Sequence, residues 1–147
     1  MVLLTAKEII NELLVDVFNH ILDIEEDELK KENVKLSMKE VHAIEAISRT
    51  KDKTMSNVAK TLRITVGSLT ICIDRLVSKG YVKRVNDEFD RRKVLIELTT
   101  KGEEVLAIHN QFHENMLKDV VNDLSLEDNE VLIKSLETVK DYFKEKM

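Results

Sequence analysis

The sequence predicts a mainly helical chain that carries one small β-hairpin. The 147 residues include no proline and only 3 glycines, the two residue types that most often interrupt helices. Along most of the chain, apolar residues recur at intervals of three and four, as they do on the buried face of a helix. Two short runs, residues 81–85 and 94–98, instead show the pattern of strands, and the polar tip between them predicts a hairpin.

The first predicted helix covers residues 5–26. Leu13 and Phe18 widen its apolar stripe, whose members are spaced by three and four residues: Ile10, Leu14, Val17, Ile21 and Ile24. The charged run at residues 23–31 predicts a loop or a fraying helix end. Ser37 with Glu40 forms a capping-box pattern, which predicts that a second helix begins there and runs to about residue 49.

The next stretch predicts two short helices joined by a tight turn. Thr54 and Thr65 are typical N-caps, each followed by apolar residues at helical spacing, and the turn falls at residues 63–64. Lys79 and Gly80 suit the end of the second helix, because helix C-termini favour a cation followed by a glycine.

The hairpin directly follows the second of these helices, and residues 86–92 form its tip. A helix-turn-helix followed by a hairpin is the winged helix-turn-helix arrangement. The second helix of such a pair fits the major groove of DNA, and an arginine on the hairpin can enter the adjacent minor groove. Arg91 and Arg92 are therefore minor-groove candidates, and the small residues of the second helix are major-groove candidates: Thr65, Gly67, Ser68 and Thr70. Taken alone, these residue types would equally suit ordinary solvated positions.

Positive charge is concentrated in the same region, although the whole chain has a net charge of −5. Residues 51–93 contain 11 Lys/Arg and 5 Asp/Glu, whereas residues 1–50 contain 6 and 11, and residues 94–147 contain 6 and 12. A basic surface on an acidic body is the distribution that phosphate binding requires. Double-stranded operator DNA is therefore the expected partner, with phosphate contacts from Lys60, Arg63, Arg75 and Lys79.

Two further helices are predicted near the C-terminus. Thr99 and Thr100 suit the start of a long helix that ends near residue 122, and Ser125 with Asp128 opens a last helix. The first and last helices carry long apolar stripes outside the winged core. We therefore predict one domain, residues 1–147, in which residues 37–99 bind DNA and residues 1–36 and 100–147 hold a homodimer together. Such a dimer would place two recognition helices about one DNA turn apart; the alternative is that these helices pack on their own subunit.

Two stretches resemble the MarR-type transcriptional regulators. Residues 90–102 read D-R-R-K-V-L-I-E-L-T-T-K-G and resemble their wing signature, while residues 64–82 read I-T-V-G-S-L-T-I-C-I-D-R-L-V-S-K-G-Y-V and resemble their recognition helix. The resemblance implies that Asp90 orients the wing arginine Arg92 and that the terminal helices dimerise. The usual recognition helix carries basic residues where this chain has Val66 and Ile71, which favours contact with thymine methyl groups and readout of DNA shape over guanine readout.

Four segments resemble a subgroup of that family, the repressors of fatty-acid synthesis in Gram-positive bacteria. They read F-N-H-I-L-D-I-E-E at residues 18–26, K-E-V-H-A-I-E at 39–45, V-G-S-L-T at 66–70 and I-H-N-Q-F-H-E-N-M at 108–116. The resemblance implies a long-chain acyl-acyl carrier protein as corepressor. Its acyl chain would need an apolar tunnel. The candidate lining residues are Leu14, Phe18, Ile21, Ile44, Ile108, Phe112 and Met116. The same side chains would also suit an ordinary hydrophobic core.

The histidines predict an alternative effector, a zinc ion. His109 and His113 are four residues apart and so share a helix face, and His42 could join them. Further candidate ligands are His20, Glu25 and Glu45. The family resemblance supports this alternative, because a zinc-responsive subgroup uses histidines in comparable helices. Apart from zinc, no cofactor is expected.

Other function classes find little support in the sequence. An enzyme is not expected, because there is no glycine-rich phosphate loop, nucleophile elbow or spaced catalytic triad. The single cysteine, Cys72, excludes an internal disulfide, fits a reducing compartment and suits a packing role better than redox sensing. No signal peptide or membrane-length apolar run is visible, so a cytoplasmic protein without a membrane partner is expected. The alternative of another class is a helical adaptor that docks onto another protein through its hairpin.

Overall fold

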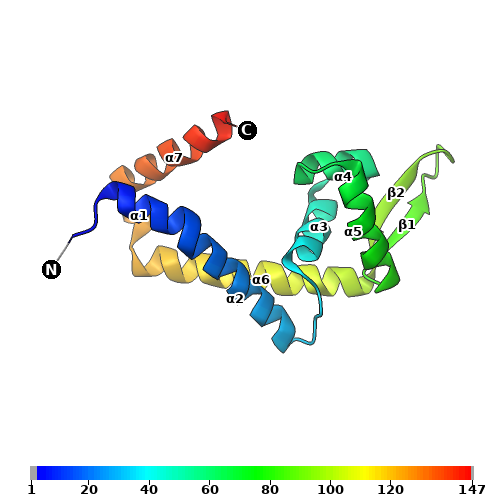
Figure 1. Ribbon diagram of the computed structural model, residues 1–147, viewed down its shortest axis with the longest axis horizontal. Helices are drawn as coiled ribbons and strands as arrows, with labels where there is room; N and C mark the ends of the chain where they lie inside the picture. The colour runs from blue at the N-terminus through cyan, green and yellow to red at the C-terminus, as the bar shows by residue number, and fades with distance from the viewer. Residues whose placement is uncertain (1–2, 147) are drawn as a thin grey trace. The chain divides into compact units, whose positions relative to one another are not determined.

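The computed structural model describes residues 3–146, which form two compact units. The first unit ends at Asn110 and the second begins at Gln111. Helices dominate both units, and strands β1, Val82–Asn86, and β2, Val94–Leu98, form the only sheet within residues 3–146 (Figure 1). The predicted fold class, mainly helical with one β-hairpin, is confirmed. No helix in this described part of the chain is long and apolar enough to cross a membrane.

The chain opens with a continuous helical run made of α1, Ala6–Glu12, a π-helical turn, Leu13–Val17, and α2, Phe18–Lys31. A capping box starts it, since the Thr5 hydroxyl accepts the Glu8 N–H at 3.3 Å and the Glu8 carboxylate accepts the Thr5 N–H at 2.7 Å. The helix therefore begins where the sequence predicts.

The predicted loop or frayed end at residues 23–31 is wrong, because α2 continues to Lys31. The charges that suggested a loop form ion pairs along the helix: Lys30 with Glu26 at 3.2 Å and Lys31 with Glu28 at 2.7 Å. Two lysines in the last turn also suit the negative end of the helix dipole. In addition, Leu29 is buried in the core of the first unit, which holds this last turn in place.

Three helices form the winged part of the first unit: α3, Met38–Arg49, α4, Met55–Leu62, and α5, Val66–Ser78. Each begins after the predicted N-cap, because the hydroxyls of Ser37, Thr54 and Thr65 each accept the backbone N–H three residues later. Between α4 and α5, Arg63 turns the chain with a φ of 58°. After α5, Gly80 has a φ of 85°, a conformation that glycine adopts without strain.

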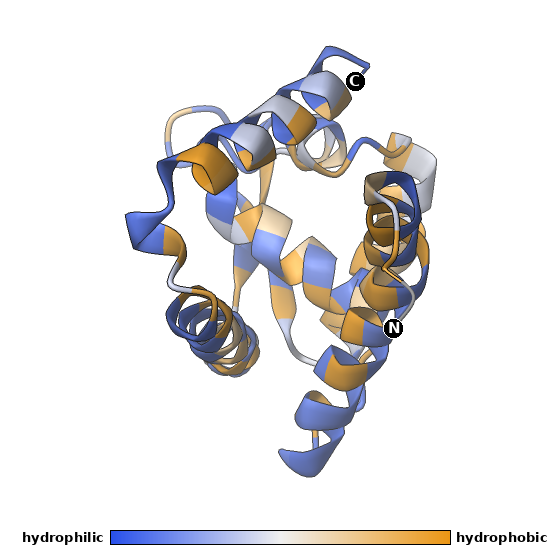
Figure 2. Ribbon diagram, turned by 90° about the vertical axis from the view of Figure 1, so that its left-hand side faces the viewer, coloured by the Kyte–Doolittle hydropathy of each residue, from blue (hydrophilic) through white to orange (hydrophobic). Residues whose placement is uncertain are grey.

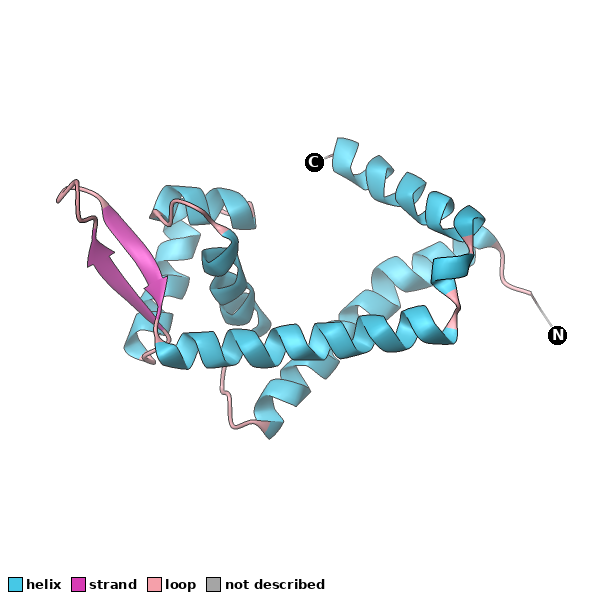
Figure 3. Cartoon of the chain, turned by 180° about the vertical axis from the view of Figure 1, so that it is seen from behind, coloured by secondary structure: helices cyan, strands magenta, loops and turns pink. Residues whose placement is uncertain are grey.

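The hairpin is bonded along its side to the segment before α4, and at its base it leads into the next helix (Figure 3). β1 begins at Val82, one residue later than predicted, and pairs in register from Val82 opposite Leu98 to Asn86 opposite Val94. At the side, the Ile96 N–H donates to the Lys53 carbonyl at 2.8 Å, just before α4. Strand β2 therefore also pairs, through one antiparallel bridge between Leu95 and Thr54, with the segment that leads to α4.

At the base of the hairpin, the first turn of α6, Thr100–Asp123, is bonded to the end of α5. The Thr99 hydroxyl donates to the Gly80 carbonyl at 2.6 Å and accepts the Gly102 N–H at 3.2 Å. The Lys101 ammonium donates to the Lys79 carbonyl at 3.1 Å. We call these contacts the α6 tether.

The core of the first unit fixes the orientation of α5. Its side chains come from α2, α3, α4, α5, the hairpin and the first turns of α6. Leu69, Ile73 and Leu76 of α5 are each 0% exposed in it. Because these positions follow the helical period, the opposite face of α5, which includes Gly67 and Ile71, must point to solvent.

The second unit contains the later part of α6, a 3₁₀ turn, Leu126–Asp128, and α7, Glu130–Glu145. The prediction that Ser125 opens the last helix is wrong. Ser125 instead has a φ of 49°, and Asn129 caps α7 by accepting the Leu132 N–H at 3.0 Å. Asparagine is as good an N-cap as serine, so the sequence contains two suitable caps four residues apart, and the prediction used the earlier one.

Large apolar side chains are exposed on the N-terminal helical run and on α7. Leu13 is 53% and Phe18 57% exposed in the first unit, while Val131 is 78% and Leu136 50% exposed in the second. In Figure 2, hydrophobic residues recur along the helix that begins near the N-terminal label. Extended apolar surface of this kind marks interaction sites. Both stretches lie in the segments predicted to dimerise, and the homodimer itself stays a prediction.

Candidate nucleic-acid interface

The predicted major-groove residues lie together in the first turns of α5. The Thr65 hydroxyl accepts the Ser68 N–H at 3.1 Å and donates to the Ser68 hydroxyl at 3.0 Å. The Thr70 hydroxyl donates to the Val66 carbonyl at 2.8 Å. Gly67 is exposed between them. The exposed start of α5 therefore carries small polar side chains whose hydroxyl groups already have hydrogen-bond partners within the helix.

The wing tip is held by short-range hydrogen bonds that leave its arginines exposed. The Asp90 carboxylate accepts the Arg92 N–H at 3.0 Å, and the Asp87 carboxylate accepts the Phe89 N–H at 2.8 Å. Arg91 and Arg92 are both exposed, and neither makes an ion pair within residues 3–146. The structure thus brings Asp90 next to Arg92 as predicted, through the backbone of the arginine rather than its guanidinium.

A charge pair also supports the wing. The Phe89 N–H, and then Lys93, lower the pKa of the Asp87 carboxyl below its ordinary value. A hydrogen bond from Lys93 to Asp52, 2.8 Å long, raises the pKa of the lysine, and Asp87 adds to this effect. Both groups are therefore charged at neutral pH, and the contribution of Asp87 is lost only as the pH falls through its lowered pKa.

An ion pair joins the wing to the recognition helix. Arg84 of β1 donates to the Asp74 carboxylate of α5 at 2.5 Å. Local sequence patterns do not reveal this pair, because a contact between a helix and a strand depends on the tertiary fold. The side chain of Asp74 is 61% exposed and that of Arg84 36% exposed, so water competes for both.

We expect this ion pair to stabilise the fold only slightly in spite of its short distance. A double-mutant cycle with Asp74→Asn and Arg84→Gln should give a coupling free energy below about 1 kcal/mol, as exposed pairs usually do. Urea unfolding would measure it, and added salt should reduce it further. A coupling of several kcal/mol that salt does not change would show that the pair behaves as a buried one.

The four predicted phosphate contacts differ in their surroundings. Lys60 on α4 and Arg75 on α5 are exposed. Arg63 is exposed at the turn between α4 and α5. Lys79 instead pairs with the Glu40 carboxylate at 2.9 Å, and the side chain of Glu40 is only 9% exposed. A DNA phosphate would have to compete with this carboxylate for Lys79.

The predicted acyl-tunnel residues fall in both units. Ile44 is 0% exposed in the core, and Ile108 packs against that core. Leu14 is 48% and Phe18 57% exposed, while Ile21 is half-buried. Phe112 and Met116 belong to the second unit. Whether these residues line one tunnel therefore stays a prediction.

A different groove lies between α3 and α5 in the first unit. It has a volume of about 450 Å³, and its lining includes His42, Ser68, Ile71, Cys72 and Arg75 but none of the predicted tunnel residues. Burial raises the pKa of the Cys72 thiol above its ordinary value, and the Glu40 carboxylate adds to this effect. The thiol is therefore protonated and weakly reactive at neutral pH, which agrees with a packing role.

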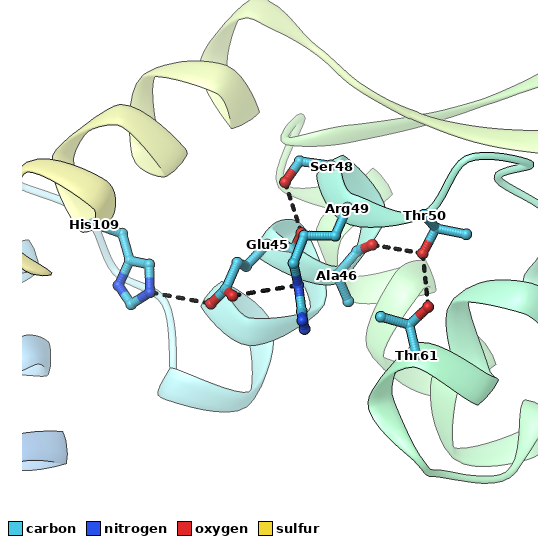
Figure 4. Close-up of polar contacts among 7 residues, drawn as sticks. All are labelled: Glu45, Ala46, Ser48, Arg49, Thr50, Thr61 and His109. Atoms are coloured by element: carbon cyan, nitrogen blue, oxygen red, sulfur yellow. Dashed lines mark hydrogen bonds and ion pairs between the residues drawn. The ribbon is translucent and has the colours of Figure 1, made fainter. Parts of the chain in front are cut away.

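Part of the predicted zinc-ligand set lies close together in the first unit. The His109 ring is 3% exposed, and its Nε2 lies 3.3 Å from the Glu45 carboxylate (Figure 4). The centroids of the His42 and His109 rings are 6.1 Å apart. A carboxylate oxygen of Glu25, which is also 3% exposed, lies within 4.8 Å of a His109 ring nitrogen. These donor types fit a zinc ion; His20 is exposed on α2, and His113 belongs to the second unit.

Comparison with known proteins identifies the family. The family described as transcriptional regulator SarA/Rot matches residues 27–109. The multiple antibiotic resistance protein MarR of Escherichia coli is 41% identical over 66 residues, which span 45% of this chain but only 44% of that protein. The HTH-type regulator YpoP of Bacillus subtilis is 31% identical over 99 residues, 67% of this chain and 68% of that protein.

A solved structure matches nearly the whole chain. Streptococcus pneumoniae FabT, crystallised in complex with DNA, superimposes with a TM-score of 0.83 at 36% identity, covering 94% of this chain and 97% of that one. The match includes both the winged part and the terminal helices. The chain therefore belongs to the MarR-type winged helix transcriptional regulators and is a DNA-binding regulator.

Proposed function

We propose that this chain is a homodimeric repressor of fatty-acid synthesis genes, and that a long-chain acyl-acyl carrier protein strengthens its binding to operator DNA. The similarity to FabT over 94% of the chain is the single observation that carries this proposal. It agrees with the four sequence segments that resemble the fatty-acid repressors. The adaptor alternative has no comparable support.

The charges and the exposed apolar surface support the DNA-bound dimer. Residues 51–93, which contain the excess of Lys/Arg, include α4, α5 and the wing. Thr65, Gly67, Ser68 and Thr70 would meet the major groove. Arg91 and Arg92 would enter or flank the minor groove, and Lys60, Arg63 and Arg75 would contact phosphates. The exposed apolar residues of α1, α2 and α7 would be buried in the dimer.

The effector assignment is tested by titration of operator binding. Gel-shift measurements with promoter fragments of fatty-acid synthesis genes should show tighter binding when long-chain acyl-acyl carrier protein is added, and no change with the unacylated carrier protein. Equal effects of the acylated and unacylated carriers would contradict an acyl-dependent corepressor.

A zinc-responsive repressor is the second candidate function. The short distance between Glu25 and His109, both buried, favours it. In the same gel-shift assay, operator binding is compared with zinc chloride alone and with zinc chloride plus a chelator, which distinguishes the two candidate effectors. The acyl proposal predicts no response to zinc, whereas a response to zinc alone that His42→Ala abolishes would reverse the ranking.

A further inference from the structure

The outward face of α5 presents an apolar side chain where a DNA-binding helix usually presents polar ones. Leu69, Ile73 and Leu76 point into the core and are 0% exposed, so Ile71 points in the opposite direction. The Ile71 side chain is 60% exposed, and Val66 in the first turn is 46% exposed. Leaving a large aliphatic group in water contributes nothing to the fold.

Gly67 lies one helical turn before Ile71 on the same face, and the fold does not require a glycine there. A Cβ at this position would meet only the Thr65 hydroxyl oxygen, at 3.9 Å, and the backbone of Gly67 does not have a positive φ. A glycine inside a helix is unfavourable relative to alanine. Its place on the exposed face is explained if another molecule approaches the α5 backbone closely at this point.

Two of the three hydroxyls beside this pair, those of Thr65 and Thr70, have already used their only donor hydrogen within the helix, although all three keep acceptor lone pairs. The Thr65 hydroxyl bonds to Ser68, and the Thr70 hydroxyl donates to the Val66 carbonyl. The centre of the face therefore consists of the Ile71 side chain and the bare backbone at Gly67. In the major groove, the group that matches an apolar side chain is the C5 methyl of thymine.

We propose that Ile71 packs against the methyl group of a thymine in each operator half-site, and that Gly67 lets the α5 backbone approach that base. This inference rests on the proposed DNA-binding function and assigns part of its specificity to apolar contact. It also explains why α5 can dispense with basic residues at positions 66 and 71. The affinity for phosphates would then come from Lys60, Arg63 and Arg75, and the sequence preference from the centre of α5.

The experiment removes single methyl groups from the DNA. The full-length protein first selects its preferred duplexes from a random-sequence pool, and each thymine of the selected half-site is then replaced by deoxyuridine, which lacks only the methyl. Fluorescence anisotropy should identify one thymine per half-site whose replacement weakens binding by about fourfold, the value of one buried methyl group. The Ile71→Ala variant should bind the selected duplex more weakly and should be indifferent to the same replacement.

The control is Leu124→Ala, which removes an aliphatic side chain that is likewise 60% exposed but lies outside α5. Because residue 124 falls in the segment predicted to dimerise, the control is compared at a concentration at which sedimentation shows the same oligomeric state as the wild type. This variant should remain as sensitive to the deoxyuridine replacement as the wild type. If the deoxyuridine replacement weakened binding by the wild type and by Ile71→Ala equally, the inference about Ile71 would be overturned, while the proposed DNA-binding function would stand. If no sequence were enriched in the selection, the operator-binding function would fail together with it.

A second variant tests the role of Gly67. Gly67→Ala should fold at least as stably as the wild type, judged by its thermal midpoint, because its Cβ would meet only the Thr65 hydroxyl oxygen, at an ordinary contact distance of 3.9 Å. Its affinity for the selected duplex should nevertheless fall several-fold, and the preference for thymine over deoxyuridine should shrink. Unchanged affinity and preference in this variant would show that the α5 backbone does not approach the base.

Discussion

Gly102→Ala is expected to lower the free energy of unfolding by about 2–4 kcal/mol. Gly102 is buried in the first turn of α6, where an added Cβ would overlap the backbone carbonyl oxygen of Tyr81. The obstacle is backbone rather than a flexible side chain. The overlap can therefore be relieved only by moving the start of α6 away from the end of α5, which breaks the α6 tether. Urea unfolding followed by circular dichroism would measure the loss.

Gly67→Ala is the matched control, because the same substitution is made in a helix but faces solvent. It should leave the unfolding free energy unchanged or raise it by up to about 1 kcal/mol. The two variants together separate the steric requirement at Gly102 from the general preference of helices for alanine. If both variants unfolded at the wild-type denaturant concentration, the close packing of α6 against Tyr81 would be contradicted.

Arg92→Ala is expected to weaken operator binding by about tenfold or more without changing the unfolding free energy by more than about 0.5 kcal/mol. Arg92 is exposed at the wing tip and makes no ion pair within residues 3–146, so the fold gains little from its guanidinium. A dimer would lose one such contact in each half-site. Fluorescence anisotropy at several salt concentrations would provide both the affinity and its salt dependence.

Lys31→Ala is a suitable control for Arg92→Ala, since it removes one positive charge from an exposed side chain outside the basic region. Its operator affinity should stay close to that of the wild type. If Arg92→Ala bound operator as tightly as this control did, the wing would not be a DNA contact. A reduced salt slope in Arg92→Ala would indicate a phosphate contact, whereas an unchanged slope with lower affinity would indicate a base contact.

Local patterns predicted most of the fold. Ser37, Thr54 and Thr65 cap the helices that the sequence assigns to them, because an N-cap depends on residues within three positions of each other. The errors occurred where two local signals competed. The charged run ending at Lys31 suggested a loop, but its charges pair with one another along the helix. Asn129 caps the last helix, although Ser125 is also a suitable N-cap residue.

The candidate site was predictable in outline but not in its contacts. The order of helices, hairpin and arginines predicted which elements would contact DNA, and the structure places the predicted residues at the start of α5 and on the exposed wing tip. The pairing of Lys79 with Glu40 joins residues 39 positions apart, and that of Arg84 with Asp74 joins a strand to a helix. Such pairs depend on how the elements pack, which helical periodicity does not reveal. The exposure of Ile71 follows from the buried positions of α5, whereas only the coordinates show that a Cβ at Gly67 would fit without overlap.

The α6 tether has a mechanical consequence. Bonds from Thr99 and Lys101 reach the carbonyls of Gly80 and Lys79, so the start of α6 is joined directly to the two residues that follow α5. An effector that displaced the start of α6 would pull on the end of α5, the helix proposed to contact bases, without touching α5 itself. Binding of an effector at α6 would thus change the affinity for operator DNA through these hydrogen bonds, without a rearrangement of the rest of the winged core.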